Sequence, residues 1–211
     1  MATAVAVEIH NLRDLLRQLG DIPPERVRMR PAPGTATVAD VVKNKLCELI
    51  DDTLVEKTMG AREAMLALAI GAWLRDFVKP RKLGIVLGAD ATLEILSGLV
   101  RLPDVAFISW DRMPDRKIPK EPVPDLVPDL AVEVLSKGNT KDEMIRKRRE
   151  YFKAGVRLVW MVEPKTRTVD VYTSVKKFST IREEDTLDGG TVLPGFKLPL
   201  RKLFEELDEQ G

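Results

Sequence analysis

The sequence is poor in the residue types that hold metal clusters and redox pairs. It has one cysteine, Cys47, and one histidine, His10, among 211 residues. A single thiol excludes an internal disulfide, a CxxC pair and a thiolate zinc cluster, and is typical of a reducing compartment. A single imidazole excludes a histidine cage for zinc or copper and the HExxH motif of metalloproteases. We therefore expect any bound metal to be held by oxygen atoms.

The chain also lacks a strong charge of either sign and a long hydrophobic run. It has 34 Lys and Arg against 33 Asp and Glu, a formal net charge of +1, so nucleic-acid binding would need a local basic patch. The apolar stretch 64–73 is followed by Arg75 and Asp76 and is shorter than the roughly 18 residues of a membrane span. Residues 1–8 lack the features of a secretory signal. These absences predict a cytoplasmic protein without a membrane span.

The length predicts one domain with a short extension, because domains usually have roughly 100 to 200 residues. Apolar residues at helical spacing over 9–19 predict an N-terminal helix, and the segment 26–37, with two prolines and a glycine, is typical of a linker. We therefore expect an N-terminal helix and linker over 1–37 and a main domain over 38–211.

The main domain alternates strand-like and helical patterns. A hairpin is expected around the turn 51–53, a largely buried helix over 61–78, and a second helix that begins at the capping box Thr140–Glu143 and ends near Gly155. The proline-rich segment 113–128 is expected to be a loop. Further strands are expected at 84–87, 92–96, 104–110, 129–136, 158–162 and 169–173, with a short amphipathic end at 200–207.

Glu133 is the most informative residue because it interrupts an otherwise apolar run, 130–135. Such a run is typical of a strand covered on both faces, where an ionised carboxylate is costly unless something neutralises it. A glutamate at a strand edge, or one hydrogen-bonded within the core, is the simpler explanation. The alternative is a divalent cation such as Mg²⁺, which prefers hard oxygen ligands.

A second carboxylate would be needed beside Glu133. Asp129 lies on the same face of the same strand, but at about 13 Å along an extended chain it is too far to share one ion. Asp104 opens another predicted strand and could meet Glu133 if the two strands pair. Taken alone, Asp104 after Pro103 is more typical of a turn.

A lysine would complete a hydrolytic site. The helix 141–153 carries six basic side chains, most of which are expected to be solvated. Lys147 differs from them because Met144 and Tyr151 flank it on the same helix face, which leaves its ammonium free to reach the strand ends.

These residues resemble a known family. Pro103-Asp104 followed twenty-nine positions later by Glu133 is similar to the split acidic motif of the PD-(D/E)XK nuclease superfamily. The sequence resembles more closely the Uma-two family of restriction endonucleases. The resemblance covers about 46–204 and is carried by the segments 47–51, 102–109, 128–136, 154–156, 158–164 and 185–196, with Lys147 and Tyr151.

The resemblance implies an α/β, restriction-endonuclease-like fold, a mixed β-sheet flanked by helices with the N-terminal helix as an extension. It also implies Mg²⁺, or Mn²⁺, held by Asp104, Glu133 and the carbonyl of Val134, and attack by water on a DNA phosphodiester. The superfamily lysine two residues after the glutamate is replaced by Leu135, as is usual for this family, and Lys147 takes the displaced position on the helix.

Some assignments stay open at this point. Lys137 competes with Lys147, because it shares a strand face with Glu133 and stands where the family commonly has proline. Arg148 stands where the family usually has an apolar residue. An additional acid is typical of the superfamily, and Glu63 fits best, with Glu48 as the alternative.

The resulting prediction is a metal-dependent DNA endonuclease in which Asp104, Glu133, Lys147 and Glu63 are catalytic. A homodimer is plausible because two symmetric sites can cut two strands. One alternative is an inactive nucleic-acid-binding module that uses Arg146, Arg148 and Arg149. The other is a protein-interaction domain without affinity for nucleic acid, which the small net charge allows.

Overall fold

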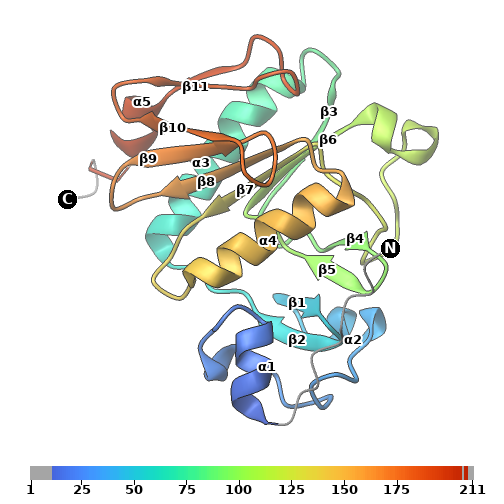
Figure 1. Cartoon of the computed structure of the whole chain (residues 1–211). Helices are drawn as coiled ribbons and strands as arrows, with labels where there is room; N and C mark the ends of the chain where they lie inside the picture. The colour runs from blue at the N-terminus through green and yellow to red at the C-terminus, as the bar shows by residue number, and fades with distance from the viewer. Residues whose placement is uncertain (1–10, 206, 209–211) are drawn as a thin grey trace.

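The computed structural model describes residues 11–205, 207 and 208. His10 and the expected start of the first helix at Ile9 lie outside these residues. A six-stranded sheet forms the centre of the molecule, helices cover both of its faces, and a four-stranded sheet lies beside it (Figure 1). The expected class, an α/β restriction-endonuclease-like mixed sheet flanked by helices, is confirmed. Within the described part of the chain, no helix is long and apolar enough to cross a membrane.

The large sheet is mixed because one neighbouring pair is parallel. Its strands β7 and β8 run in the same direction, and all its other pairs are antiparallel. Every residue of β7 is buried, as the apolar run around Glu133 predicts for a strand covered on both faces. In sheet order the strands are β10 (Phe178–Arg182), β9 (Thr168–Tyr172), β8 (Leu158–Glu163), β7 (Leu130–Val134), β6 (Val105–Ser109) and β3 (Gly84–Leu87).

Two long helices cover opposite faces of this sheet (Figure 1). Helix α3 (Ala61–Val78) packs Leu66, Ile70 and Leu74 on one face. Helix α4 (Lys141–Ala154) packs Met144 and Tyr151 on the other. The predicted capping box begins α4, and the left-handed conformation of Gly155, with φ +97°, ends it. The C-terminal β11 (Thr186–Asp188), β12 (Lys197–Pro199) and α5 (Leu200–Glu205) complete the core on the α3 side.

The four-stranded sheet contains the predicted hairpin. Its strands β1 (Cys47–Ile50) and β2 (Thr53–Glu56) are joined by Asp51 and Asp52, both with positive φ. The order is β2-β1-β5-β4, with β5 (Leu99–Arg101) and β4 (Leu93–Leu96). The expected strands 84–87 and 92–96 both form, but they belong to different sheets because β3 pairs with β6 and β4 pairs with β5. The short β5 is not apparent from the sequence pattern.

The N-terminal segment packs against this smaller sheet. Leu15 and Leu19, at the helix α1 (Leu12–Gln18), contact Ile50 and Val55 of the hairpin. The segment is also tied to α4 by charge, since Arg26 donates two hydrogen bonds, of 3.0 and 2.8 Å, to Glu143. Two short elements lie between α1 and the hairpin: the 3₁₀ turn η1 (Pro24–Arg26) and the helix α2 (Val38–Lys43). Two more 3₁₀ turns, η2 (Trp110–Arg112) and η3 (Pro114–Arg116), follow β6.

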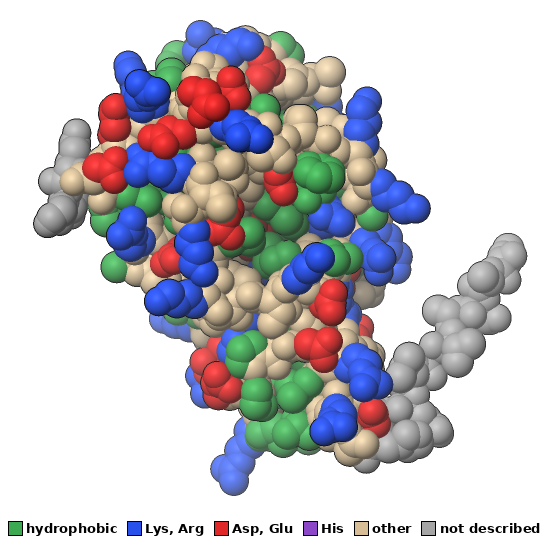
Figure 2. Space-filling model, turned by 60° about the vertical axis from the view of Figure 1, so that its left-hand side comes forward, with side chains coloured by type: hydrophobic (Ala, Val, Ile, Leu, Met, Phe, Trp, Pro, Cys, Tyr) green, Lys and Arg blue, Asp and Glu red, His purple; other side chains and the backbone are tan. Residues whose placement is uncertain are grey.

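Charged side chains of both signs are mixed on the face of the molecule that Figure 2 shows. Figure 2 shows one face of the molecule, on which Lys and Arg are interspersed with Asp and Glu instead of forming one continuous basic area. This distribution agrees with the net charge of +1. Attraction of a polyanion to this face would therefore be local and short-ranged.

Candidate active site

Strand pairing brings the two predicted acids together. Strands β6 and β7 are antiparallel, with Val105 opposite Val132, and Asp104 immediately precedes β6 beside the end of β7 that carries Glu133. The amide of Asp104 donates to the carbonyl of Val132 at 2.9 Å, which ties Asp104 to β7 next to Glu133. The pairing on which the sequence argument depended is therefore present. Both acids are buried, at 3% exposure for Asp104 and 4% for Glu133.

The two carboxylate oxygens of Asp104 have different surroundings. Oδ2 accepts a hydrogen bond from the amide of Val134 at 2.6 Å. Oδ1 accepts no well-formed hydrogen bond, and the ammonium of Lys57 lies 2.7 Å from it. The backbone of β7 therefore orients the carboxylate, while a single side chain compensates the charge at Oδ1.

Glu133 is held by two residues of α4. Its Oε1 accepts a hydrogen bond of 2.5 Å from the hydroxyl of Tyr151, and its Oε2 lies 3.1 Å from the ammonium of Lys147. Burial raises the pKa of Glu133, Lys147 offsets part of this effect, and the neighbouring Asp104 and Glu48 raise it further. Burial and Glu133 also raise the pKa of Tyr151 well above its usual value, so this hydroxyl keeps its proton and donates.

Lys147 connects the two acids Glu133 and Glu48. Its ammonium lies 3.1 Å from Glu48 Oε1 as well as 3.1 Å from Glu133. Burial alone would lower the pKa of this lysine, but the two carboxylates raise it above its usual value, and the side chain remains charged. Lys147 and Tyr151 are four residues apart in α4, so they share the helix face that points at β7.

Arg101 completes the buried charge network. It donates to Glu48 Oε2 at 2.6 Å and also pairs with Glu150 of α4. Sequence reasoning missed both Arg101 and Lys57. The signal for Arg101 was available, since it is a charged residue between apolar Val100 and Leu102, the same pattern that singled out Glu133.

The remaining predicted residues lie at the edge of this network or outside it. Glu63 is partly exposed in the first turn of α3, and no hydrogen bond or ion pair found among the described residues links it to Asp104 or Glu133. Lys137 is exposed in the turn after β7. Asp129, at the opposite end of β7, pairs with Arg112 and Arg157. Of the two candidate lysines the network contains Lys147, and of the two candidate additional acids it contains Glu48. The catalytic roles of the predicted residues stay predictions.

The donors at Asp104 and Glu133 fit an oxygen-seeking divalent ion. In the part of the chain that the structure describes, no three acidic, histidine or cysteine side chains are placed to hold a metal by themselves. Two carboxylates with a backbone carbonyl, completed by water and phosphate, are nevertheless a usual set for Mg²⁺. Asp104 Oδ1, buried and without a hydrogen bond, is the oxygen best able to accept such an ion.

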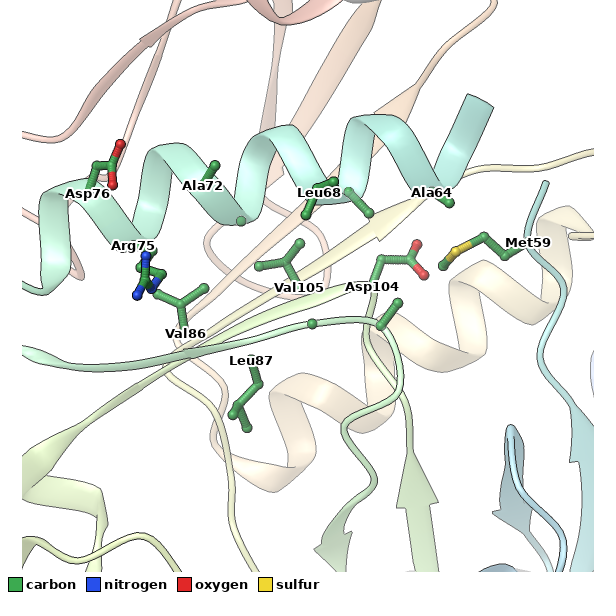
Figure 3. A pocket seen from close by; sticks show the side chains of 14 residues that line it. Met59, Ala64, Leu68, Ala72, Arg75, Asp76, Val86, Leu87, Asp104 and Val105 are labelled. Carbon is green, nitrogen blue, oxygen red and sulfur yellow. The ribbon is translucent and has the colours of Figure 1, made fainter. Parts of the chain in front are cut away.

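A groove leads to this site from the surface. It has a volume of about 450 Å³ and is lined by residues of α3 and β3, with Asp104 at one end (Figure 3). Its walls are mainly apolar, and the exposed Leu68 of α3 contributes to them. An ion or substrate that enters this groove from solvent would therefore meet Asp104 before the rest of the buried network.

The cations around Glu48 predict that the protein loses stability in acid. Burial alone would raise the pKa of Glu48, but Lys147 and Arg101 lower it from 4.5 to about 2. A lowered folded-state pKa contributes stability that is complete above the unfolded pKa and is lost as the pH falls from about 4.5 to about 2. At 1.36 kcal/mol per pKa unit, this contribution is on the order of 3 kcal/mol.

Urea titrations at a series of pH values measure this effect. The free energy of unfolding of the wild type should fall between about pH 4.5 and about pH 2, the two pKa values of Glu48. The Glu48→Gln variant should show a smaller slope over the same interval. If the free energy of unfolding falls equally with pH in the two proteins, Glu48 does not have a lowered pKa in the folded state.

Comparisons with known proteins show the family and the fold. The family model Uma2, described as "Putative restriction endonuclease", matches residues 37–201. The fold is similar to that of a solved "putative nuclease belonging to DUF820 from Anabaena variabilis ATCC 29413", with a TM-score of 0.68 and 18% sequence identity. That match covers 76% of this chain and 90% of the other. No curated protein matches the chain. Because the family model spans more than half of the sequence, the chain belongs to the Uma2 family.

Proposed function

We propose that the protein is a Mg²⁺-dependent endonuclease that hydrolyses DNA phosphodiester bonds, with Mn²⁺ as a possible substitute. The observation that supports this most directly is that Asp104 bonds to the backbone of β7 on both sides of Glu133, at Val132 and Val134, while the ammonium of Lys147 lies 3.1 Å from Glu133. Family membership supports nuclease activity in general terms. The geometry of the site supports the residue roles proposed below.

Each residue has one task in this proposal. Asp104, Glu133 and the carbonyl of Val134 would hold the ion, which would supply a lowered pKa for a water molecule and offset charge on the phosphate. Lys147 keeps its positive charge beside Glu133 and stabilises the negative charge that develops on the phosphoryl oxygens. Tyr151 fixes Glu133 by its hydrogen bond, and Glu48 positions Lys147 from the opposite side.

The additional acid of the superfamily remains to be assigned between two candidates. Glu48 lies inside the network, where Lys147, Arg101 and the amide of Leu102 already occupy its oxygens. Glu63 is partly exposed near the groove and is free of this network in the described structure. Glu48 therefore acts on Lys147, and Glu63 is the candidate for contact with water or substrate.

DNA would approach along the groove that ends at Asp104, and its phosphates would be the main source of binding energy. Three basic residues of α4 were candidates for a binding module without catalysis. Arg146 is engaged by Asp51 and Glu150, and Arg148 lies over the ring of Tyr172, whereas Arg149 is exposed. Only one of the three is thus readily available to a phosphate, which favours the nuclease over the binding module.

The test is the cleavage of supercoiled plasmid by the purified protein. We expect nicked circles with millimolar Mg²⁺ or Mn²⁺ and no product with EDTA. A linear product would indicate that both strands are cut, as two symmetric sites of a homodimer could do. DNA binding should weaken steeply as the salt concentration rises.

Two results would contradict the nuclease. DNA binding without cleavage in either metal would favour the inactive binding module. No binding even at low salt would favour the protein-interaction domain.

A further inference from the structure

Lys57 is a buried charged residue that the proposed reaction does not use. It follows the hairpin strand β2, and its side chain is 6% exposed. Its ammonium lies 2.7 Å from Asp104 Oδ1 and donates to the carbonyl of Ala89 at 2.9 Å. We propose that Lys57 is a resident counter-cation of Asp104, that a divalent ion displaces it on binding, and that Lys57 thereby sets the metal affinity of the site. This inference rests on the proposed function.

The environment of the carboxylates shows why Lys57 competes with an ion at one atom. Oδ2 of Asp104 is held by the amide of Val134, and both oxygens of Glu133 are held by Tyr151 and Lys147. Oδ1 of Asp104 accepts no well-formed hydrogen bond and has only the lysine charge beside it. The oxygen most open to an ion is therefore the one at which the lysine charge already lies.

Two cations cannot share this oxygen without a large penalty. An ammonium and a divalent ion at the same carboxylate oxygen would be a few ångströms apart, where burial leaves like charges poorly screened. Lys57 must then move away or weaken the binding of the ion. In either case its positive charge lowers the affinity of the site.

The structure provides room for Lys57 to move. A hollow of about 200 Å³ adjoins its side chain and is lined by Leu46, Met59, Ala89 and Asp90. Met59 lies close to the Asp104 carboxylate at the end of the groove (Figure 3), so the hollow is next to the site. The four-carbon stem of a lysine is flexible. The carboxylate of Asp90 is a second anion toward which the ammonium of Lys57 can turn.

Calorimetric titration with Mn²⁺ tests the inference through binding, without reference to cleavage. Lys57→Met keeps most of the apolar stem and removes the charge. We expect it to bind Mn²⁺ at least about tenfold more tightly than the wild type, because the competing cation is gone. The matched control is Lys45→Met, which removes an exposed lysine near the same hairpin and should change the affinity less than about twofold.

Thermal unfolding adds a second measurement. In EDTA, Lys57→Met should melt below the wild type, because Asp104 loses its counter-charge, and saturating Mn²⁺ should raise its melting temperature more than that of the wild type. If Lys57→Met does not fold, Lys57→Arg is the second test, because it keeps the charge and can bind the carboxylate of Asp104 through two hydrogen bonds. That variant should bind Mn²⁺ more weakly than the wild type.

The outcomes separate the two proposals. Equal or weaker Mn²⁺ binding by Lys57→Met, with normal binding by the wild type, would overturn the role of Lys57 and leave the nuclease intact. Unchanged binding by Lys57→Arg would count against it in the same way. If neither the wild type nor Lys57→Met binds Mn²⁺, the metal-dependent nuclease and the inference on Lys57 fail together.

Discussion

Replacing Glu133 by Gln should reduce plasmid cleavage by at least about a thousandfold while DNA binding is retained. A thousandfold loss corresponds to about 4 kcal/mol of transition-state stabilisation. Gln keeps the size of the side chain and can still accept the hydrogen bond from Tyr151, but it removes the negative charge that faces Lys147 and that would hold the ion. Cleavage should therefore fall because metal binding and charge balance are lost together.

The control is another glutamate of the same sheet. Glu163, at the end of β8, is partly exposed and outside the buried network. Glu163→Gln should cleave within about threefold of the wild type, since a surface charge affects only steering. The assays are gel-based nicking rates in Mg²⁺ and a fluorescence titration of labelled DNA. If Glu133→Gln cleaves at the wild-type rate, Glu133 is a structural glutamate and the site lies elsewhere.

Replacing Arg101 by Met should destabilise the fold by about 3–5 kcal/mol. Arg101 is 1% exposed and compensates the negative charges of two glutamates, Glu48, which is 0% exposed, and Glu150. Without Arg101, one lysine would have to serve both Glu48 and Glu133. The cost is high because a buried carboxylate is left undercompensated, which is more expensive than the intact ion pair is favourable.

Urea denaturation at pH 7 measures this loss. Arg116, which is 67% exposed and forms only a 3.9 Å contact with Asp111, is the matched control. Arg116→Met should change the free energy of unfolding by no more than about 0.5 kcal/mol. The double variant Glu48→Gln with Arg101→Met should recover part of the loss, because it removes the undercompensated charge. A loss below about 1 kcal/mol in Arg101→Met would show that water enters the network.

The central residues of the site could be predicted because their sequence context was unusual. Glu133 interrupts an apolar strand, and Lys147 shares a helix face with Tyr151. The spacing of Asp104, Glu133 and Lys147 also carried the resemblance to the family that the family model shows. Such patterns are local, so the sequence contains them in full.

The sequence offered Glu48 only as the alternative additional acid and did not single out Lys57, because long-range pairing places both in the network. Glu48 joins Lys147 from ninety-nine positions earlier, through the packing of the hairpin against α4. Lys57, which follows the second strand of the same hairpin, meets Asp104 at the start of β6. In sequence Glu48 lies between apolar Cys47 and Leu49, and Lys57 is an ordinary charge after a short strand, but neither context indicates which side chain each one meets.

The sequence by itself determined the two long helices, most strands of the large sheet, the turn at Asp51 and Asp52, the caps of α4 and the buried acid on β7. Each of these follows from side-chain preferences within a few residues. The tertiary structure decided which cation meets which carboxylate: Lys147 with Glu133 and Glu48, and Lys57 with Asp104. Electrostatic pairing in a buried site depends on distances of a few ångströms, which only the register and packing of the sheets determine.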